Sequence, residues 1–194
     1  VYGRSMYFMG KENSDYKFKS VDLNGQGYSS ELSNVQGLAE GDIDVADYNN
    51  DGYPDILVVG DSENNTETTL LYDGNGGSFN LNEEISFTGF RDATAKWIDY
   101  DNDGDLDLVI NNINEEAYIL KNTSNKVHKN NYLKIKFKGD TFNTFGIGAK
   151  VKAYSNHQII TEENYTTKGY LSSVAPKIHI GLGTLQTIDS VHII

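Results

Sequence analysis

The densest group of side chains that could do chemistry lies between Asp99 and Asp107. These nine residues read DYDNDGDLD and carry five carboxylates, and the apolar run Leu108-Val109-Ile110 follows at once. Carboxylates held this close repel one another unless a cation neutralises them. Their oxygens are the ligands that Ca²⁺ prefers. The stretch therefore predicts a calcium-binding loop.

A second copy of the pattern occurs earlier in the chain, where residues 46–59 align with residues 98–111. Side-chain oxygens at positions 1, 3, 5 and 9 of each loop can converge on one point, and the position-7 carbonyl can complete the shell. Gly52 and Gly104, at position 6, allow the sharp turn that this needs. The sequence therefore predicts two Ca²⁺ sites, with the ligands Asp47, Asn49, Asp51, Tyr53 and Asp55 in the first loop and Asp99, Asp101, Asp103, Asp105 and Asp107 in the second.

An EF-hand loop begins in the same way but requires a carboxylate at position 12 and flanking helices. Position 12 is Val58 in the first loop and Ile110 in the second, each within a β-like run, so the EF-hand interpretation fails. The stretch near Asp22, VDLNGQGYSS, has Gln26 and Ser30 where acids are needed. We assign no metal to it.

The elements that must position these loops are strands. Short alternating or β-rich runs recur along the chain, separated by turn sequences, and no convincing helix of ten residues is present. The self-similarity has a period of about 50 residues with about four strands per unit, which is typical of β-propeller blades. We predict an all-β chain: about two to two and a half blades of a partial propeller over residues 1–125, then a small sandwich-like β domain over residues 126–194.

The loop pattern, closing directly onto a strand, resembles the calcium loop of FG-GAP/VCBS repeats, which form integrin-like β-propellers. After residue 128, the segments GIGAKVKAY, KGYLSSVAPKIHIGLG and IDSVHII occur in the order found in ASPIC/UnbV domains. This second resemblance implies a module that commonly follows VCBS repeats in bacterial exported proteins. The family pattern usually continues beyond the last strand, so we expect the chain to be truncated.

The composition of the chain argues against several other classes of function. The chain has no cysteine, which excludes disulfides and thiolate metal sites. From residue 31 to residue 116, 21 acidic residues are balanced only by Arg91 and Lys96, which argues against nucleic-acid binding there. The C-terminal lysines alternate with apolar residues, as on a solvated strand face. No apolar run reaches the length of about 18 residues that a membrane-spanning helix needs.

Catalytic patterns are weak. No nucleophile elbow is present, and the histidines have no ligand spacing. The pairs Glu83-Glu84 and Glu115-Glu116 could supply carboxylates for glycoside hydrolysis, but adjacent acids near turns usually face solvent. His179 alternates with Ile178 and Ile180, so a hydrogen-bonded structural role is expected for it.

We therefore expect an extracellular or cell-surface, calcium-binding, non-catalytic module, exported from a bacterium, that serves adhesion or binds a protein or a glycan. Calcium would be mainly structural. Two alternatives remain: a subunit of a self-assembling surface filament or layer, and an accessory region of a polysaccharide-acting enzyme whose catalytic part lies outside this chain.

Overall fold

The computed structural model describes residues 6–12, 15–21, 27–28, 35–36, 38–62, 64–75, 78–113, 115–127, 129–167 and 173–194. The chain forms two compact units: one contains residues 1–46, 54–96 and 109–119, and the other contains residues 47–53, 97–108 and 120–194. The predicted boundary near residue 125 remains a prediction. Most of the stretch near Asp22 lies outside the described residues.

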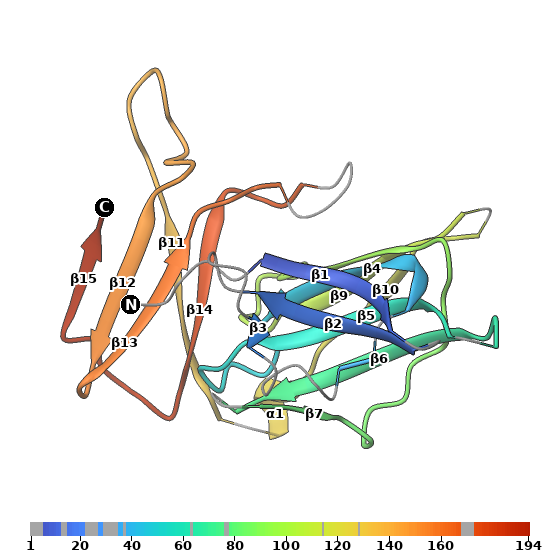
Figure 1. Cartoon of the computed structure of the whole chain (residues 1–194). Coiled ribbons are helices and arrows are strands. Elements are labelled where there is room, and N and C mark those ends of the chain that lie inside the picture. Colours follow the sequence, from blue (N-terminus) through green and yellow to red (C-terminus); the bar gives the residue numbers. More distant parts are fainter. Residues whose placement is uncertain are drawn as a thin grey trace. The chain divides into compact units, whose positions relative to one another are not determined.

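The described structure consists almost entirely of antiparallel strands, which confirms the all-β prediction (Figure 1). The first part of the chain holds a three-stranded sheet and a four-stranded sheet, each in chain order. Their strands are β1 (Met6–Glu12), β2 (Asp15–Val21) and β3 (Gly27–Tyr28), then β4 (Ala39–Ala46), β5 (Asp55–Asp61), β6 (Glu67–Gly74) and β7 (Phe79–Leu81).

In the four-stranded sheet, the burial of apolar side chains explains why this part of the sequence forms strands. Every residue of β5 is buried, as expected for a central strand covered on both faces. Ile56 and Val58 of β5 pack with Val35, Leu38 and Tyr72 in one apolar cluster. A four-stranded antiparallel sheet in chain order is the organisation of a propeller blade, but the predicted partial propeller stays a prediction.

A third sheet has the order β10-β9-β8, with β8 at Thr94–Ile98, β9 at Asp107–Asn111 and β10 at Tyr118–Leu120. A four-residue helix, α1 (Ser124–Val127), follows β10. The two acidic loops thus occupy equivalent places. Each joins the first two strands of its sheet, β4 to β5 and β8 to β9.

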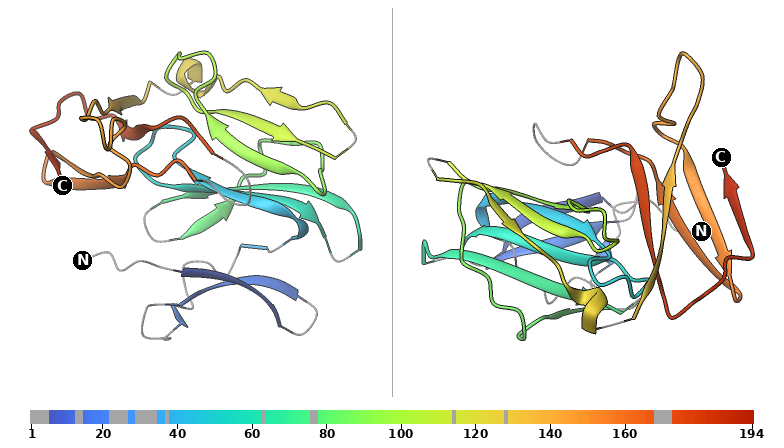
Figure 2. Two further views of the ribbon diagram at one scale, coloured as in Figure 1. Left: turned by 90° about the horizontal axis from the view of Figure 1, so that it is seen from above. Right: turned by 180° about the vertical axis from the view of Figure 1, so that it is seen from behind.

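The C-terminal strands form two further sheets, which Figure 2 shows from two sides. One pairs β11 (Asn131–Lys136) with β14 (Lys177–Gly183), and the other has the order β13-β12-β15. The strands of this second sheet are β12 (Lys150–Ser155), β13 (Gln158–Glu163) and β15 (Ser190–Ile193). Side chains of both sheets, including Val151, Ile178 and Ile180, share one core.

Candidate metal centre

The second acidic loop brings three of its predicted ligands together. One carboxylate oxygen each of Asp99, Asp101 and Asp107 lies within 4.8 Å of the other two. Asp99 directly follows β8 and Asp107 begins β9, and both are buried, whereas Asp101 is exposed. Residues at positions 1, 3 and 9 of the loop therefore converge, as their spacing predicts.

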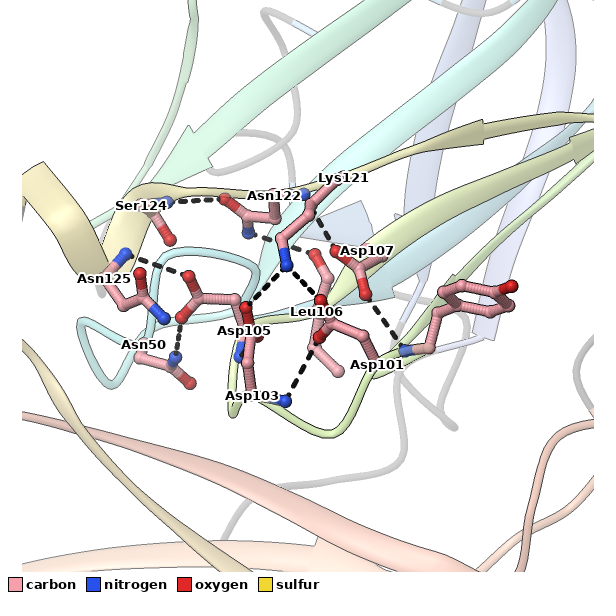
Figure 3. Close-up of polar contacts among 11 residues, drawn as sticks. Asn50, Asp101, Asp103, Asp105, Leu106, Asp107, Lys121, Asn122, Ser124 and Asn125 are labelled. Atoms are coloured by element: carbon pink, nitrogen blue, oxygen red, sulfur yellow. Dashed lines mark hydrogen bonds and ion pairs between the residues drawn. The ribbon is translucent and has the colours of Figure 1, made fainter.

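The backbone of this loop is curled by residues in the left-handed region. Asn102 has φ 61° and Gly104 has φ 102°. The Asp101 carboxylate accepts the Asp103 N–H at 3.1 Å, and the Asp103 carboxylate accepts the Asp105 N–H at 3.1 Å (Figure 3). These short-range bonds fix the backbone of the turn between Asp101 and Asp105.

Asp107 is fixed by two backbone donors from different segments. Its Oδ2 accepts the N–H of Tyr100 at 3.0 Å, and its Oδ1 accepts the N–H of Asn122 at 2.8 Å. The carboxylate of Asp105 takes another direction, because its Oδ2 accepts the N–H of Asn125 at 2.9 Å. Burial raises the pKa of Asp105. Only its backbone carbonyl was predicted to be a ligand, and that role stays a prediction.

Two lysines bring positive charge to the loop. Lys121 forms ion pairs with Asp101 and, at 3.2 Å, with Asp103 (Figure 3). These hydrogen bonds raise the pKa of Lys121 to about 12, and the Lys121 bond is the main cause of a lowered pKa at Asp101. Lys134, on β11, forms an ion pair with Asp99 Oδ2. Three of the five carboxylates of this loop thus attract cationic groups.

Sequence reasoning missed both lysines. Lys134 lies in the alternating segment LKIKFK, which predicts a solvated face. Lys136 and Lys138 are exposed as expected, but Lys134 is half-buried against the acidic loop. Local alternation shows which face of β11 a residue occupies, but it does not show which segment packs on that face.

The first loop repeats the backbone conformation of the second. Asn50 has φ 60° and Gly52 has φ 96°, at the same loop positions as Asn102 and Gly104. The Asp47 carboxylate accepts the N–H groups of Asp51 and Gly52, each at 2.9 Å. This agreement confirms the sequence alignment of the two loops at the level of the backbone.

The side chains of the other predicted ligands of the first loop, Asn49, Asp51 and Asp55, each accept a backbone hydrogen bond. Asn49 Oδ1 accepts the Asp51 N–H at 2.9 Å, and Asp51 Oδ1 accepts the Tyr53 N–H at 2.8 Å. Asp55 is fully buried at the start of β5, where it accepts the N–H of Gly74 at 2.9 Å.

Burial, with a smaller effect of the Asp51 charge, raises the pKa of Asp47 to about 7 despite its backbone hydrogen bonds. A neutralising cation would remove the cost of charging Asp47.

The residues of the second loop fit a hard cation. All its side-chain donors are carboxylate oxygens, which suit Ca²⁺ and do not suit soft metals. The Asp99 side chain is almost fully buried, and its Oδ1 has no hydrogen-bond donor among the described residues. A buried, unpaired carboxylate oxygen is costly, and a bound cation would satisfy it.

The other candidate groups do not form a competing site. Glu83, Glu84, Glu115 and Glu116 are all exposed, as expected for solvent-facing pairs. His179 Nε2 lies 2.6 Å from Asn50 Oδ1, which is the hydrogen-bonded structural role expected for it. Trp97 is buried and stacks on Tyr48, with ring centroids 5.3 Å apart.

Comparison with protein families supports both resemblances noted in the sequence. Residues 47–110 match the FG-GAP-like repeat family, and residues 139–194 match the ASPIC and UnbV family. A comparison with curated proteins gave no match. The two family matches indicate an extracellular adhesion-like or enzyme-accessory module, and FG-GAP repeats commonly mediate protein interactions. Among the described residues, no helix is long and apolar enough to cross a membrane.

Proposed function

We propose that this chain is a calcium-binding, non-catalytic module that works outside the cell, in adhesion or in binding a protein or a glycan. The observation that carries the proposal is the convergence of Asp99, Asp101 and Asp107 on one point of a loop that is repeated at Asp47–Asp55. Five oxygen ligands per loop, with water, would meet the six to eight that Ca²⁺ takes.

In this proposal calcium is structural. Each ion would neutralise a loop that joins two strands, and it would replace the lysine contacts at Asp99, Asp101 and Asp103. Neutralisation would relieve the repulsion among the carboxylates and fix the turn. Binding to a partner would then occur elsewhere on a surface that calcium keeps in shape.

Thermal unfolding with calcium and with a chelator tests the proposal. At a calcium concentration 100 times the Kd, one site stabilises the folded state by about 2.7 kcal/mol. For a chain of this size we expect a rise in Tm of about 5–10 °C. Asp103→Ala and Asp51→Ala should each remove part of the rise, whereas Glu83→Ala, at an exposed acid outside the loops, should leave it intact. An unchanged Tm in the wild-type protein would contradict calcium binding.

Self-association is a second candidate function, favoured by the loop between β11 and β12. In Figure 1 this loop extends well away from its strands. In this loop, Phe142 is 98% exposed and Phe145 is 52% exposed. The loop is nonetheless held in shape, because Gly139 N–H bonds to Thr144 O at 2.8 Å and Asn164 Nδ2 donates to Phe145 O at 2.8 Å. Aromatic side chains are enriched at protein–protein interfaces, and two exposed ones lie on this loop.

Sedimentation velocity over a range of protein concentrations distinguishes the two candidates. Self-association predicts larger species at high concentration, and Phe142→Ser should abolish them while leaving the Tm unchanged. A monomer at all concentrations, with and without calcium, would exclude self-association and leave the binding module.

A further inference from the structure

One face of β14 packs against the first acidic loop. Side chains alternate along a strand, so Ile178, Ile180 and Leu182 point into the β core while residues 179, 181 and 183 lie on the other face. The three residues of that second face are His179, Gly181 and Gly183, and each has a specific contact with residues 47–51.

The contacts are close. His179 Nε2 lies 2.6 Å from Asn50 Oδ1 and donates its hydrogen to that carbonyl oxygen. The N–H of Gly183 bonds to the Asn50 backbone oxygen at 2.7 Å. At Gly181 a Cβ atom would overlap the Asp47 carboxylate and would lie 2.8 Å from Asn50 Cα. Glycine at 181 thus leaves the space that a predicted calcium ligand occupies.

Asn50 also reaches the second loop. Its Nδ2 donates to Gly104 O at 3.1 Å. The same nitrogen lies 3.4 Å from Asp105 Oδ1 (Figure 3). The Asn50 side chain therefore makes contacts with both β14 and the second loop, and only 2% of the residue is exposed. Asn102 has the same φ and the same position in its own loop, but it is exposed.

Asn122 makes a second bridge between the loops. Its Nδ2 donates to Tyr48 O at 2.7 Å and to Leu106 O at 3.0 Å, and its N–H holds Asp107. The two loops are thus linked at two points, through the side chains of Asn50 and Asn122. A change of shape in either loop must move groups that the other loop uses.

We propose that the two acidic loops bind calcium as one coupled unit, in which Asn50 is the coupling residue and the 179–183 face of β14 holds Asn50 in place. Asn50 is a positioning residue, because its side chain does not lie at a ligand position. Filling one loop fixes the Asn50 bridge and so prepares the other loop, which gives positive cooperativity. This inference rests on the proposed function.

A double-mutant cycle measured by calorimetric titration of the full chain with Ca²⁺ tests the coupling. Asp103→Ala disables the second loop, so that the remaining heat reports the first. In the wild-type background we expect this change to lower the calcium affinity of the first loop by about tenfold, which is within the usual range of coupling between sites. In the Asn50→Gly background the same change should alter the calcium affinity of the first loop by less than about twofold.

Asn102→Gly is the matched control, because it makes the same replacement at the same backbone conformation without removing a bridge. In that background the tenfold effect of Asp103→Ala should persist. If Asn50→Gly does not fold, His179→Phe provides a second test. The phenylalanine ring keeps the stacking on Tyr132, where the ring centroids are 5.3 Å apart, but it removes the hydrogen bond to Asn50. It too should abolish the coupling.

The outcomes separate the two proposals. If the wild-type chain takes up no calcium, the proposed function fails and the coupling fails with it. If calcium binds and Asp103→Ala leaves the remaining site at its wild-type affinity, only the coupling is overturned. It is also overturned if Asn50→Gly and His179→Phe leave the tenfold effect unchanged.

Discussion

The His179 ring nitrogen Nε2 lies 2.6 Å from the side-chain oxygen of Asn50, 129 residues away in the sequence. This contact joins a strand of the ASPIC/UnbV-like region to a loop of the FG-GAP-like repeat. Both residues belong to the same compact unit. The acidic loop is therefore shaped by its own sequence and also by a strand outside the repeat.

Burial lowers the pKa of His179 to about 4, and the charges of Lys134 and Lys177 add to the effect. The folded-state value lies below the unfolded value of about 6.5, so the folded chain binds this proton less readily. The associated stability is complete above pH 6.5 and is lost as the pH falls toward 4.

We therefore expect wild-type protein in calcium-free buffer to lose stability between pH 7.5 and 4.5 relative to His179→Gln, which stays neutral. After allowance for partial exposure the difference should reach about 1–2 kcal/mol. Urea unfolding at several pH values measures it. Parallel curves for the two proteins would show that His179 titrates normally in the folded state.

Replacing Gly181 by alanine should push the first loop away from β14. The added Cβ would overlap the Asp47 carboxylate and crowd Asn50 Cα. Overpacking of this kind costs about 1–3 kcal/mol, or several degrees in Tm for a chain of this size. Calcium affinity should also fall, because Asp47 is a predicted ligand.

Gly148→Ala is the comparison for that change. Gly148 has φ 85° and no atom lies within 4 Å of a Cβ built there, so alanine brings backbone strain without overlap. Its calcium affinity should equal that of wild type. Equal calcium affinity in the Gly181→Ala variant would show that the loop adjusts without moving Asp47.

Removing the Lys121 ammonium should strengthen calcium binding at the second loop. Lys121 is ion-paired with Asp101 and Asp103, and a bound calcium ion would have to displace it and be repelled by it. Because the pair is exposed, we expect Lys121→Met to raise the affinity only about two- to fivefold. Lys126→Met, at an exposed lysine of α1, changes the net charge equally. Similar gains in the two variants would point to overall charge and not to the ion pair.

The raised pKa of Asp47, about 7, predicts opposite effects with and without calcium. The folded-state value lies above the unfolded value, so the associated stability is complete at low pH and is lost as the pH rises toward 7. Asp47→Asn removes this cost but also loses one of the two backbone hydrogen bonds that the carboxylate accepts, so at pH 8 with chelator it should raise the Tm by no more than a few degrees. With saturating calcium it should lower the Tm below that of wild type, because a ligand is lost. A Tm above that of wild type in both buffers would contradict a ligand role for Asp47.

Much of the candidate metal centre could be predicted from the sequence because it is local. Asp99, Asp101 and Asp107 fall within nine residues, and their spacing, with a glycine at position 6, is enough to predict their convergence. Gly52 and Gly104, which were predicted to allow the sharp turn, have φ 96° and 102°. The all-β class and the order of the two families were also readable from strand periodicity and short motifs.

The tertiary structure alone decided what surrounds the loops. The bond from Asn50 to Gly104 spans 54 residues, and the bond from His179 to Asn50 spans 129. Alternation along β14 and β11 shows that His179 and Lys134 lie opposite the core, but such a face can meet water or another segment equally well. Only the packing of the folded chain determines which of these occurs, since contacts between distant segments depend on the arrangement of whole strands and not on local spacing.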